Sequence, residues 1–146
     1  MPKLYFKYGA MNSSKSANAL MVKFNYEEQG YRVALLKPSL DDRDGVDIVK
    51  SRIGLEQKCY VIDRTVNLLE WYRAHRDYQV MIVDEAQFLT PEQVEQLKDL
   101  AVDAIPVLCF GLKTDFQTKM FPASKRLFEL ADSLSEIKSV CRCGRK

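Results

Sequence analysis

The sequence of 146 residues has little net charge and no long apolar run. The formal net charge is +2 and the basic residues are scattered, so nothing resembles the polybasic arm of a nucleic-acid-binding protein. The N-terminus lacks the apolar core of a signal peptide, and no apolar stretch approaches the length that spans a bilayer. We therefore expect a cytoplasmic location, with neither a nucleic-acid polymer nor a membrane as partner.

Histidine and cysteine are also scarce. The one histidine, His75, lies among charged residues and is expected at the surface rather than in catalysis. The four cysteines do not form a disulfide framework. Cys59 and Cys109 lie in apolar runs, where we expect small buried core residues. Cys141 and Cys143 remain as candidates for metal binding.

Internal repeats, low-complexity tracts and Pro/Gly-rich linkers are absent, and the length suits one domain with its own core. Apolar, β-prone runs alternate with helical patterns, which indicates an α/β fold with parallel strands. We expect strands at 4–8, 31–36, 59–62, 80–83, 105–111 and 133–140, and helices at 15–29, 65–75, after Thr90 and at 124–131. Residues 46–58 have no clear pattern. Thr90, Pro91 and Gln93 predict a capping box at the start of their helix.

The first strand leads into Gly9-Ala-Met-Asn-Ser-Ser-Lys-Ser16, a phosphate-binding P-loop with one change. Backbone N–H groups of such a loop surround phosphate oxygens, a lysine reaches the β- and γ-phosphates, and a hydroxyl ligates magnesium. The following helix adds its positive N-terminal end. Ser14 stands where the pattern has its second glycine, and a position that needs positive φ tolerates serine poorly. The alternative is an ordinary strand, turn and helix.

The second informative stretch is Val80-Met-Ile-Val83 followed by Asp84 and Glu85. Four apolar residues that end in acids predict a strand buried on both faces of a parallel sheet. An aspartate at the carboxyl end of such a strand, beside a P-loop, helps to hold magnesium. Apolar runs that end in acids are common, so this prediction depends on the P-loop upstream.

Three loops complete the set of candidates. The acid-rich loop 41–45 is, without context, a solvated turn. The loop 112–122 contains Phe116, Met120 and Phe121, which are either a tucked hydrophobic staple or groups that face a ligand. Cys141-Arg-Cys-Gly144 is half of a zinc site, since structural zinc takes four ligands. We expect that the chain is truncated before the second pair; otherwise the cysteines are incidental.

Taken together, Gly9–Ser16, Asp84-Glu-Ala-Gln-Phe88, Gly111-Leu-Lys-Thr-Asp-Phe116 and Cys141-x-Cys-Gly144 resemble the cytosolic (type II) thymidine kinases in a bacterial form. The resemblance covers the whole chain in order, including Lys37-Pro-x-x-Asp-Asp-Arg43. It implies a P-loop NTPase-like parallel sheet flanked by helices at 1–137, and at 138–146 the first half of a zinc-binding knuckle. It also implies transfer of the ATP γ-phosphoryl group to the 5′-hydroxyl of thymidine, which gives dTMP in salvage, by a homotetramer.

The resemblance assigns roles residue by residue. Glu85 corresponds to the general base, Lys15 neutralises charge on the transferring group, and Arg43, with Asp41, lies near the reacting phosphate. Ser16 and Asp84 position Mg²⁺. The implied ATP-binding residues are Gly9, Ala10, Met11, Asn12, Ser13, Ser14, Lys15, Ser16, Asp84, Glu85, Ala86 and Gln87. The implied thymidine-binding residues are Met11, Phe88, Leu112 and Phe116, and the implied zinc ligands are Cys141 and Cys143.

Two departures and three alternatives stay open. Ser14 replaces the loop glycine, and the zinc-bound lasso that contacts thymine in this family is missing, so the chain is alternatively a nucleotide-binding fragment without activity. A P-loop ATPase or helicase-type motor also carries an Asp-Glu-Ala-Gln run, but the chain is short for two motor domains and lacks a basic track. A zinc-knuckle nucleic-acid binder is the third alternative and predicts salt-sensitive oligonucleotide binding.

Overall fold

The computed structural model describes residues 3–10, 14–39, 48–51, 54–115 and 117–138. Within them the elements follow in the order β1 (Leu4–Gly9), α1 (Lys15–Glu28), β2 (Val33–Pro38), β3 (Ile48–Lys50), β4 (Glu56–Lys58), β5 (Tyr60–Ile62), α2 (Leu68–Arg73), β6 (Val80–Val83), the 3₁₀ turn η1 (Ala86–Phe88), α3 (Pro91–Asp103), β7 (Val107–Leu112), α4 (Pro122–Leu130) and β8 (Ser133–Ile137). None of the helices in these ranges is long and apolar enough to cross a membrane.

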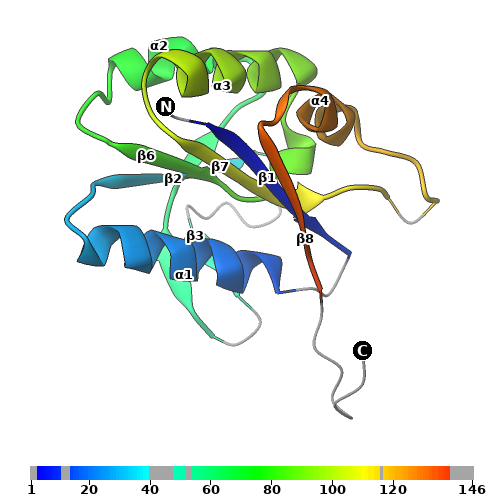
Figure 1. The fold of residues 1–146 in the computed structure, drawn as a ribbon, viewed down its shortest axis with the longest axis horizontal. Coiled ribbons are helices and arrows are strands. Elements are labelled where there is room, and N and C mark those ends of the chain that lie inside the picture. The colour runs from blue at the N-terminus through cyan, green and yellow to red at the C-terminus, as the bar shows by residue number, and fades with distance from the viewer. Residues whose placement is uncertain (1–2, 11–13, 40–47, 52–53, 116, 139–146) are drawn as a thin grey trace.

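Six strands form one sheet in the order β5-β2-β6-β7-β1-β8, and every pairing between neighbours is parallel (Figure 1). Helix α1 covers one face, on the same side as β3, and α2, α3 and α4 cover the other (Figure 1). Strands β3 and β4 form a separate antiparallel pair. This three-layer arrangement confirms the predicted α/β fold with a parallel sheet flanked by helices.

Helices cover both faces of the sheet, and successive side chains of its inner strands point to opposite faces, so each inner strand contributes to both cores. In β6, Met81 and Val83 join the core beneath α2, α3 and α4, whereas Val80 and Ile82 join the core beneath α1. Strands β2 and β7 divide their side chains in the same way. The continuous apolar runs of the sequence therefore correspond to strands with two hydrophobic faces.

The N-terminus of α3 has the capping box that the sequence predicts. The Thr90 Oγ1 accepts a hydrogen bond from the Gln93 backbone N–H at 3.0 Å, and the Gln93 Oε1 accepts one from the Thr90 backbone N–H at 3.1 Å. Pro91 occupies the first helical position, where its missing N–H is not needed. Cys59 and Cys109 are buried, as expected.

Helix α2 is shorter than the predicted 65–75. The Asp63 Oδ1 accepts hydrogen bonds from the backbone N–H and the hydroxyl of Thr65, which holds Thr65 in a turn. Asn67 then caps the helix, since its Oδ1 accepts from the N–H groups of Leu69 and Glu70. The helix therefore begins at Leu68.

One further prediction needs correction, and one stretch without a prediction has regular structure. The prediction of a buried strand at 59–62 is wrong in its burial, because β5 is the edge strand and the side chains of Tyr60 and Val61 are 38% and 44% exposed. Residues 46–58, which had no assignment, contain the short hairpin β3–β4. Its strands have three residues each, too few for a periodic pattern.

Candidate active site

Two of the three predicted catalytic residues, Lys15 and Glu85, lie near the carboxyl ends of the central strands, and the third, Arg43, lies outside the described residues. Gly9 ends β1, Asp84 and Glu85 follow β6, and Leu112 ends β7, which lies between the other two (Figure 1). Because parallel strands bring their carboxyl ends to one edge, ligands of open α/β sheets bind there. The described residues of the P-loop and the acidic pair, far apart in the sequence, therefore lie at one edge.

A direct contact joins the two motifs. The Ser16 hydroxyl, in the first turn of α1, donates a hydrogen bond to the Asp84 Oδ2 at 2.8 Å. Lys15 is buried, and its Nζ donates to the Ala10 carbonyl oxygen at 3.1 Å. Burial lowers the pKa of Lys15, while the nearby charges of Glu85 and Asp84 oppose that shift. The structure thus gathers an ammonium, a hydroxyl and two carboxyl groups.

Asp84 is a buried carboxyl group with one unused oxygen. Its Oδ1 has no hydrogen-bond partner among the described residues, and the residue is 3% exposed. Burial, reinforced by the charge of Glu85, raises the pKa of Asp84 to about 6, although the Ser16 hydroxyl and Lys15 lower it. A buried carboxylate oxygen without a donor is stabilised by a cation.

Glu85 has an unusual backbone conformation. Its φ of 55° and ψ of 38° place it in the left-handed region, which costs a non-glycine residue about 1–2 kcal/mol. The turn allows the chain to leave β6 and enter η1 directly. The half-buried Glu85 side chain accepts a hydrogen bond at Oε1 from the Gln87 Nε2 at 3.1 Å. Such strained residues cluster at functional sites.

Gln87 and Gly111 fit together at this edge. Gln87 is 3% exposed, and its Oε1 accepts a hydrogen bond from the Leu112 backbone N–H at 3.0 Å. A Cβ on Gly111 would lie 2.6 Å from the Gln87 Oε1, closer than real Cβ atoms approach another heavy atom. The glycine at position 111 therefore makes room for the buried glutamine.

The loop after β7 packs against η1 through aromatic rings. Phe88 and Phe121 meet edge to face, with 5.6 Å between their ring centroids. Such a ring contact is what the tucked alternative predicts for Phe121. Phe88 and Leu112, two of the predicted thymidine-binding residues, come from η1 and from the end of β7, which contact each other.

Ser14 does not have the positive φ that the P-loop pattern leads one to expect at this position. It precedes α1 with a φ of −88° and a ψ of 37°, so no left-handed conformation is required of it. Its carbonyl oxygen accepts hydrogen bonds from the backbone N–H and the side-chain Nδ2 of Asn18, both at 2.9 Å. In the described structure, the expected backbone penalty for serine at this position is absent.

Some predicted residues lie outside the described ranges. These are Met11, Asn12 and Ser13 of the P-loop, Asp41 and Arg43, Phe116, and the predicted zinc ligands Cys141 and Cys143. Their roles stay predictions. Within the ranges that the structure describes, no group of three or more His, Cys, Asp or Glu side chains could hold a metal ion.

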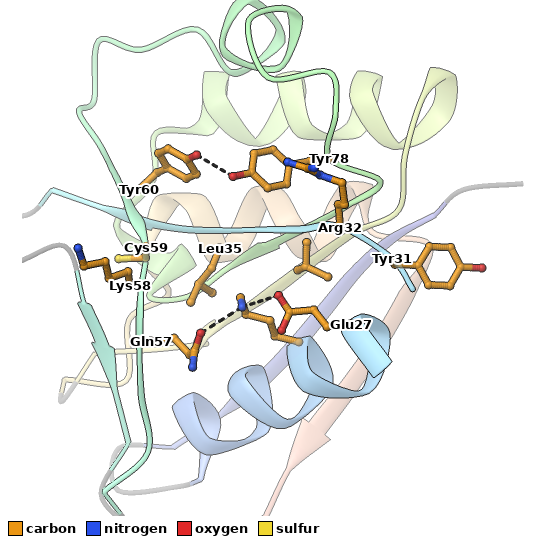
Figure 2. Close-up of a pocket in the computed structure, with 11 residues that line it drawn as sticks. Glu27, Tyr31, Arg32, Leu35, Gln57, Lys58, Cys59, Tyr60 and Tyr78 are labelled. Carbon is orange, nitrogen blue, oxygen red and sulfur yellow. Dashed lines mark hydrogen bonds and ion pairs between the residues drawn. The ribbon is translucent and has the colours of Figure 1, made fainter. Parts of the chain in front are cut away.

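A pocket of about 690 Å³ lies near α1, β4 and β5 and is not lined by Ser16, Asp84 or Glu85 (Figure 2). Its lining includes Lys23, whose Nζ donates to the Glu27 Oε2 at 2.7 Å and to the Gln57 Oε1 at 3.2 Å. The hydroxyl groups of Tyr60 and Tyr78 lie 2.7 Å apart at another wall (Figure 2). No predicted catalytic or binding residue lines this pocket.

Sequence reasoning missed the connecting residues of the site. It assigned Gln87 only to ATP binding, whereas the structure shows a buried side chain that contacts Glu85 and Leu112. It also gave Gly111 no structural role. The available signal was a glycine inside an apolar strand, which often marks the close approach of another group.

Comparison with known proteins finds relatives that are all described as thymidine kinases. The family model for thymidine kinase matches residues 2–146. The thymidine kinase of Enterobacteria phage T4 is 46% identical over 151 residues, which cover 100% of this chain and 78% of the phage protein. The thymidine kinase of Chromobacterium violaceum is 46% identical over 147 residues, covering 100% of this chain and 79% of that protein. That of Novosphingobium aromaticivorans is 47% identical over 152 residues, with coverages of 100% and 78%.

Solved structures give a more distant likeness. A DNA replication initiation factor superposes with a TM-score of 0.54 at 12% identity, covering 94% of this chain and 40% of that one. The Pif1 helicase of Candida albicans superposes with a TM-score of 0.50 at 12% identity, covering 97% of this chain and 37% of that one. At such low identity these likenesses show the fold alone. They support the P-loop NTPase-like fold class.

Proposed function

The chain belongs to the thymidine kinase family, and on that premise we propose that it transfers the γ-phosphoryl group of ATP to the 5′-hydroxyl of thymidine, giving dTMP. Family membership supports a kinase that acts on thymidine. The donor, the product and the catalytic residues are inferred from the chemistry of the site. The observation that carries this inference is the hydrogen bond from Ser16 to Asp84, because it joins the P-loop helix to the acidic pair.

The residues around Asp84 fit a magnesium ion. The Asp84 Oδ1 is buried and has no donor among the described residues, and the Ser16 hydroxyl lies beside the other oxygen. A hydroxyl and a carboxylate are oxygen ligands of the kind that Mg²⁺ prefers. When bound, Mg²⁺ neutralises charge on the β- and γ-phosphates. Ser16 and Asp84 would hold it.

Glu85 has the role of general base in this proposal. Its carboxylate takes the proton of the 5′-hydroxyl as the hydroxyl oxygen bonds to the γ-phosphorus. The bond from that phosphorus to the β–γ bridging oxygen breaks, ADP leaves with the electron pair, and Glu85 later returns the proton to solvent. The Lys15 ammonium balances charge on the transferring group. Arg43 is proposed for the same purpose.

The acceptor side is proposed at η1 and the loop after β7. Phe88 is half-buried at the carboxyl edge of the sheet and backed by Phe121, which would hold its ring in place for stacking on thymine. Leu112, Met11 and Phe116 are proposed to complete the apolar surroundings of the base. The remaining P-loop residues, with Ala86, are proposed as part of the ATP site.

The family resemblance suggests further properties as proposals. These are a kinase domain at 1–137, a zinc-binding knuckle that begins at 138–146 with Cys141 and Cys143, a homotetramer and a cytoplasmic location. Metal analysis of the purified protein and its mass in solution test the zinc and the tetramer directly.

The proposed base is tested by Glu85→Gln, which keeps the shape of the side chain and its hydrogen bond to Gln87 but removes the proton acceptor. We expect thymidine-dependent ADP formation to fall by a factor of about 10²–10⁴, the usual contribution of a general base. The thermal shift produced by MgATP should persist. Glu28→Gln, at the exposed last residue of α1, is the matched control and should retain full turnover.

Two results would contradict the proposal. Near-normal turnover by Glu85→Gln would remove Glu85 from the role of base. ADP formation that DNA or RNA stimulates in the absence of thymidine would favour a motor ATPase. The fold of this chain resembles that of such a protein.

A further inference from the structure

The Gln87 side chain lies between two parts of the site. Its Nε2 donates to the Glu85 Oε1 at 3.1 Å, and its Oε1 accepts from the Leu112 backbone N–H at 3.0 Å. The residue is 3% exposed, so its amide is turned into the protein. A buried amide with both ends bonded is rigid, because moving it would leave a buried donor or acceptor without a partner.

The backbone at Gly111 and Leu112 leaves room for the Gln87 side chain and is itself held in place. Gly111 leaves the space that the amide oxygen occupies, since a Cβ there would lie 2.6 Å from the Gln87 Oε1. The Leu112 carbonyl oxygen, which belongs to the next peptide group along the chain, accepts a hydrogen bond from the hydroxyl of buried Ser124 in α4. Leu112 is therefore held from both η1 and α4.

The backbone of Glu85 explains why such support is needed. A left-handed glutamate is strained, and strained residues persist only when surrounding contacts hold them. Proton abstraction requires the carboxylate within hydrogen-bond reach of the hydroxyl, so a small displacement would separate them. The hydrogen bond from the Gln87 Nε2 holds the Glu85 side chain in place.

We propose that Gln87 is a positioning residue, which holds the Glu85 carboxylate in register with the Leu112 peptide group at the start of the acceptor loop, rather than a side chain that binds ATP. The proposal rests on the function proposed above, in which Glu85 is the base. It assigns a purpose to the Asp-Glu-Ala-Gln spacing, since residue i+2 reaches back to the base across a single 3₁₀ turn. It also gives Gly111 a role, which is to leave the space that the Gln87 amide occupies.

The test is a separation of kcat from KM. Gln87→Met removes both hydrogen bonds at similar volume, and we expect kcat to fall by roughly 10- to 100-fold, the effect of a displacement of about 1 Å. The KM for ATP, and the thermal shift that MgATP produces, should stay within about twofold of the parent values. Gln87→Glu keeps an acceptor for Leu112 but cannot donate to Glu85 when ionised, and kcat should fall at least as far.

Gln93→Met is the matched control. Gln93 is also a buried glutamine, 2% exposed, and its Nε2 donates to the carbonyl oxygens of Asp63 and Val66 at 2.9 and 3.0 Å. It lies outside the site, so this variant should lose stability while the kcat of the folded protein is unchanged. Urea unfolding of every variant measures the folded fraction. Gly111→Ala, which displaces the amide without removing it, should lower kcat in the same way as Gln87→Met.

The possible outcomes separate the two proposals. If Glu85→Gln turns over normally, the proposed base and this inference both fail. If Glu85→Gln is inactive while Gln87→Met keeps its kcat, only this inference is overturned. A large rise in the KM for ATP with unchanged kcat would make Gln87 an ATP ligand, and an equal loss of kcat in Gln93→Met would reduce the effect to general destabilisation; either result overturns the proposal.

Discussion

Asp84→Asn should make the metal-free protein more stable at neutral pH. Burial raises the pKa of Asp84 from 3.8 to about 6, so in the folded state its ionisation is unfavourable. Between about pH 4 and pH 6 the folded protein keeps a proton that the unfolded chain has released. Stability must therefore fall as the pH rises through this window, and it should not change further above pH 6 on account of this group.

The magnitude follows from the difference in pKa. Each pKa unit corresponds to about 1.4 kcal/mol, so ionised Asp84 costs about 3 kcal/mol at pH 7. The substitution removes that cost and keeps an acceptor for the Ser16 hydroxyl. It also places an amide N–H where Oδ1 has no partner among the described residues, which costs about 1–3 kcal/mol. We expect a net gain of about 1 kcal/mol at pH 7 and a net loss at pH 4.5.

The assay is urea unfolding of both proteins at a series of pH values with EDTA present. Their difference in unfolding free energy should change by up to about 1.4 kcal/mol per pH unit between pH 4 and pH 6 and then level off. Contributions of distant groups cancel in this difference. MgATP at pH 7 should stabilise the parent far more than the variant. A difference that is flat from pH 4.5 to pH 7 would refute the reasoning.

Two other substitutions probe the cap of α3 and the aromatic contact. Thr90→Ala removes the capping box and should lower the unfolding free energy in urea by about 1 kcal/mol without changing kcat; a loss below 0.2 kcal/mol would show that the box is not stabilising. Phe121→Ala removes the ring that packs on Phe88, a contact of about 0.5–1.5 kcal/mol, and should raise the KM for thymidine by about 2- to 10-fold. An equal rise in the KM for ATP would contradict a role confined to the acceptor side.

Local signals in the sequence were sufficient to predict the buried strand at 80–83 and the start of the helix at 90–93. Each depends on residues close to it in the sequence, and the structure contains both. The start of α2 was missed because Asp63 and Asn67 can each accept hydrogen bonds from backbone N–H groups and so end or begin a helix, and propensity does not show that Asp63 holds a turn while Asn67 caps the helix. The exposure of β5 depends on its place at the sheet edge, which is a tertiary property.

In the candidate site, too, some features could be predicted from the sequence and others could not. The motifs predicted that Ser16, Asp84 and Glu85 would meet, because parallel strands end at one edge. They did not predict the left-handed backbone of Glu85 or the buried amide of Gln87. Both follow from how η1 packs against the end of β7, a contact between segments 25 positions apart. Spacing within one motif carries no information on such a contact.

The position of β1 in the sheet has a consequence for folding. In the described structure β1 pairs only with β7 and β8, and Leu4 stands opposite Val107. The strand that leads into the P-loop is made before the other strands of the sheet, and its partners β7 and β8 are made last among them. Contacts of such large sequence separation slow folding, because a long loop must close before they form. The central pairs of β2 with β6, and of β6 with β7, can assemble before β1 is added. We therefore expect β1, with its neighbour β8, to be the last part of the sheet to form, and nascent chains that end before residue 107 to carry β1 as an unpaired, aggregation-prone strand.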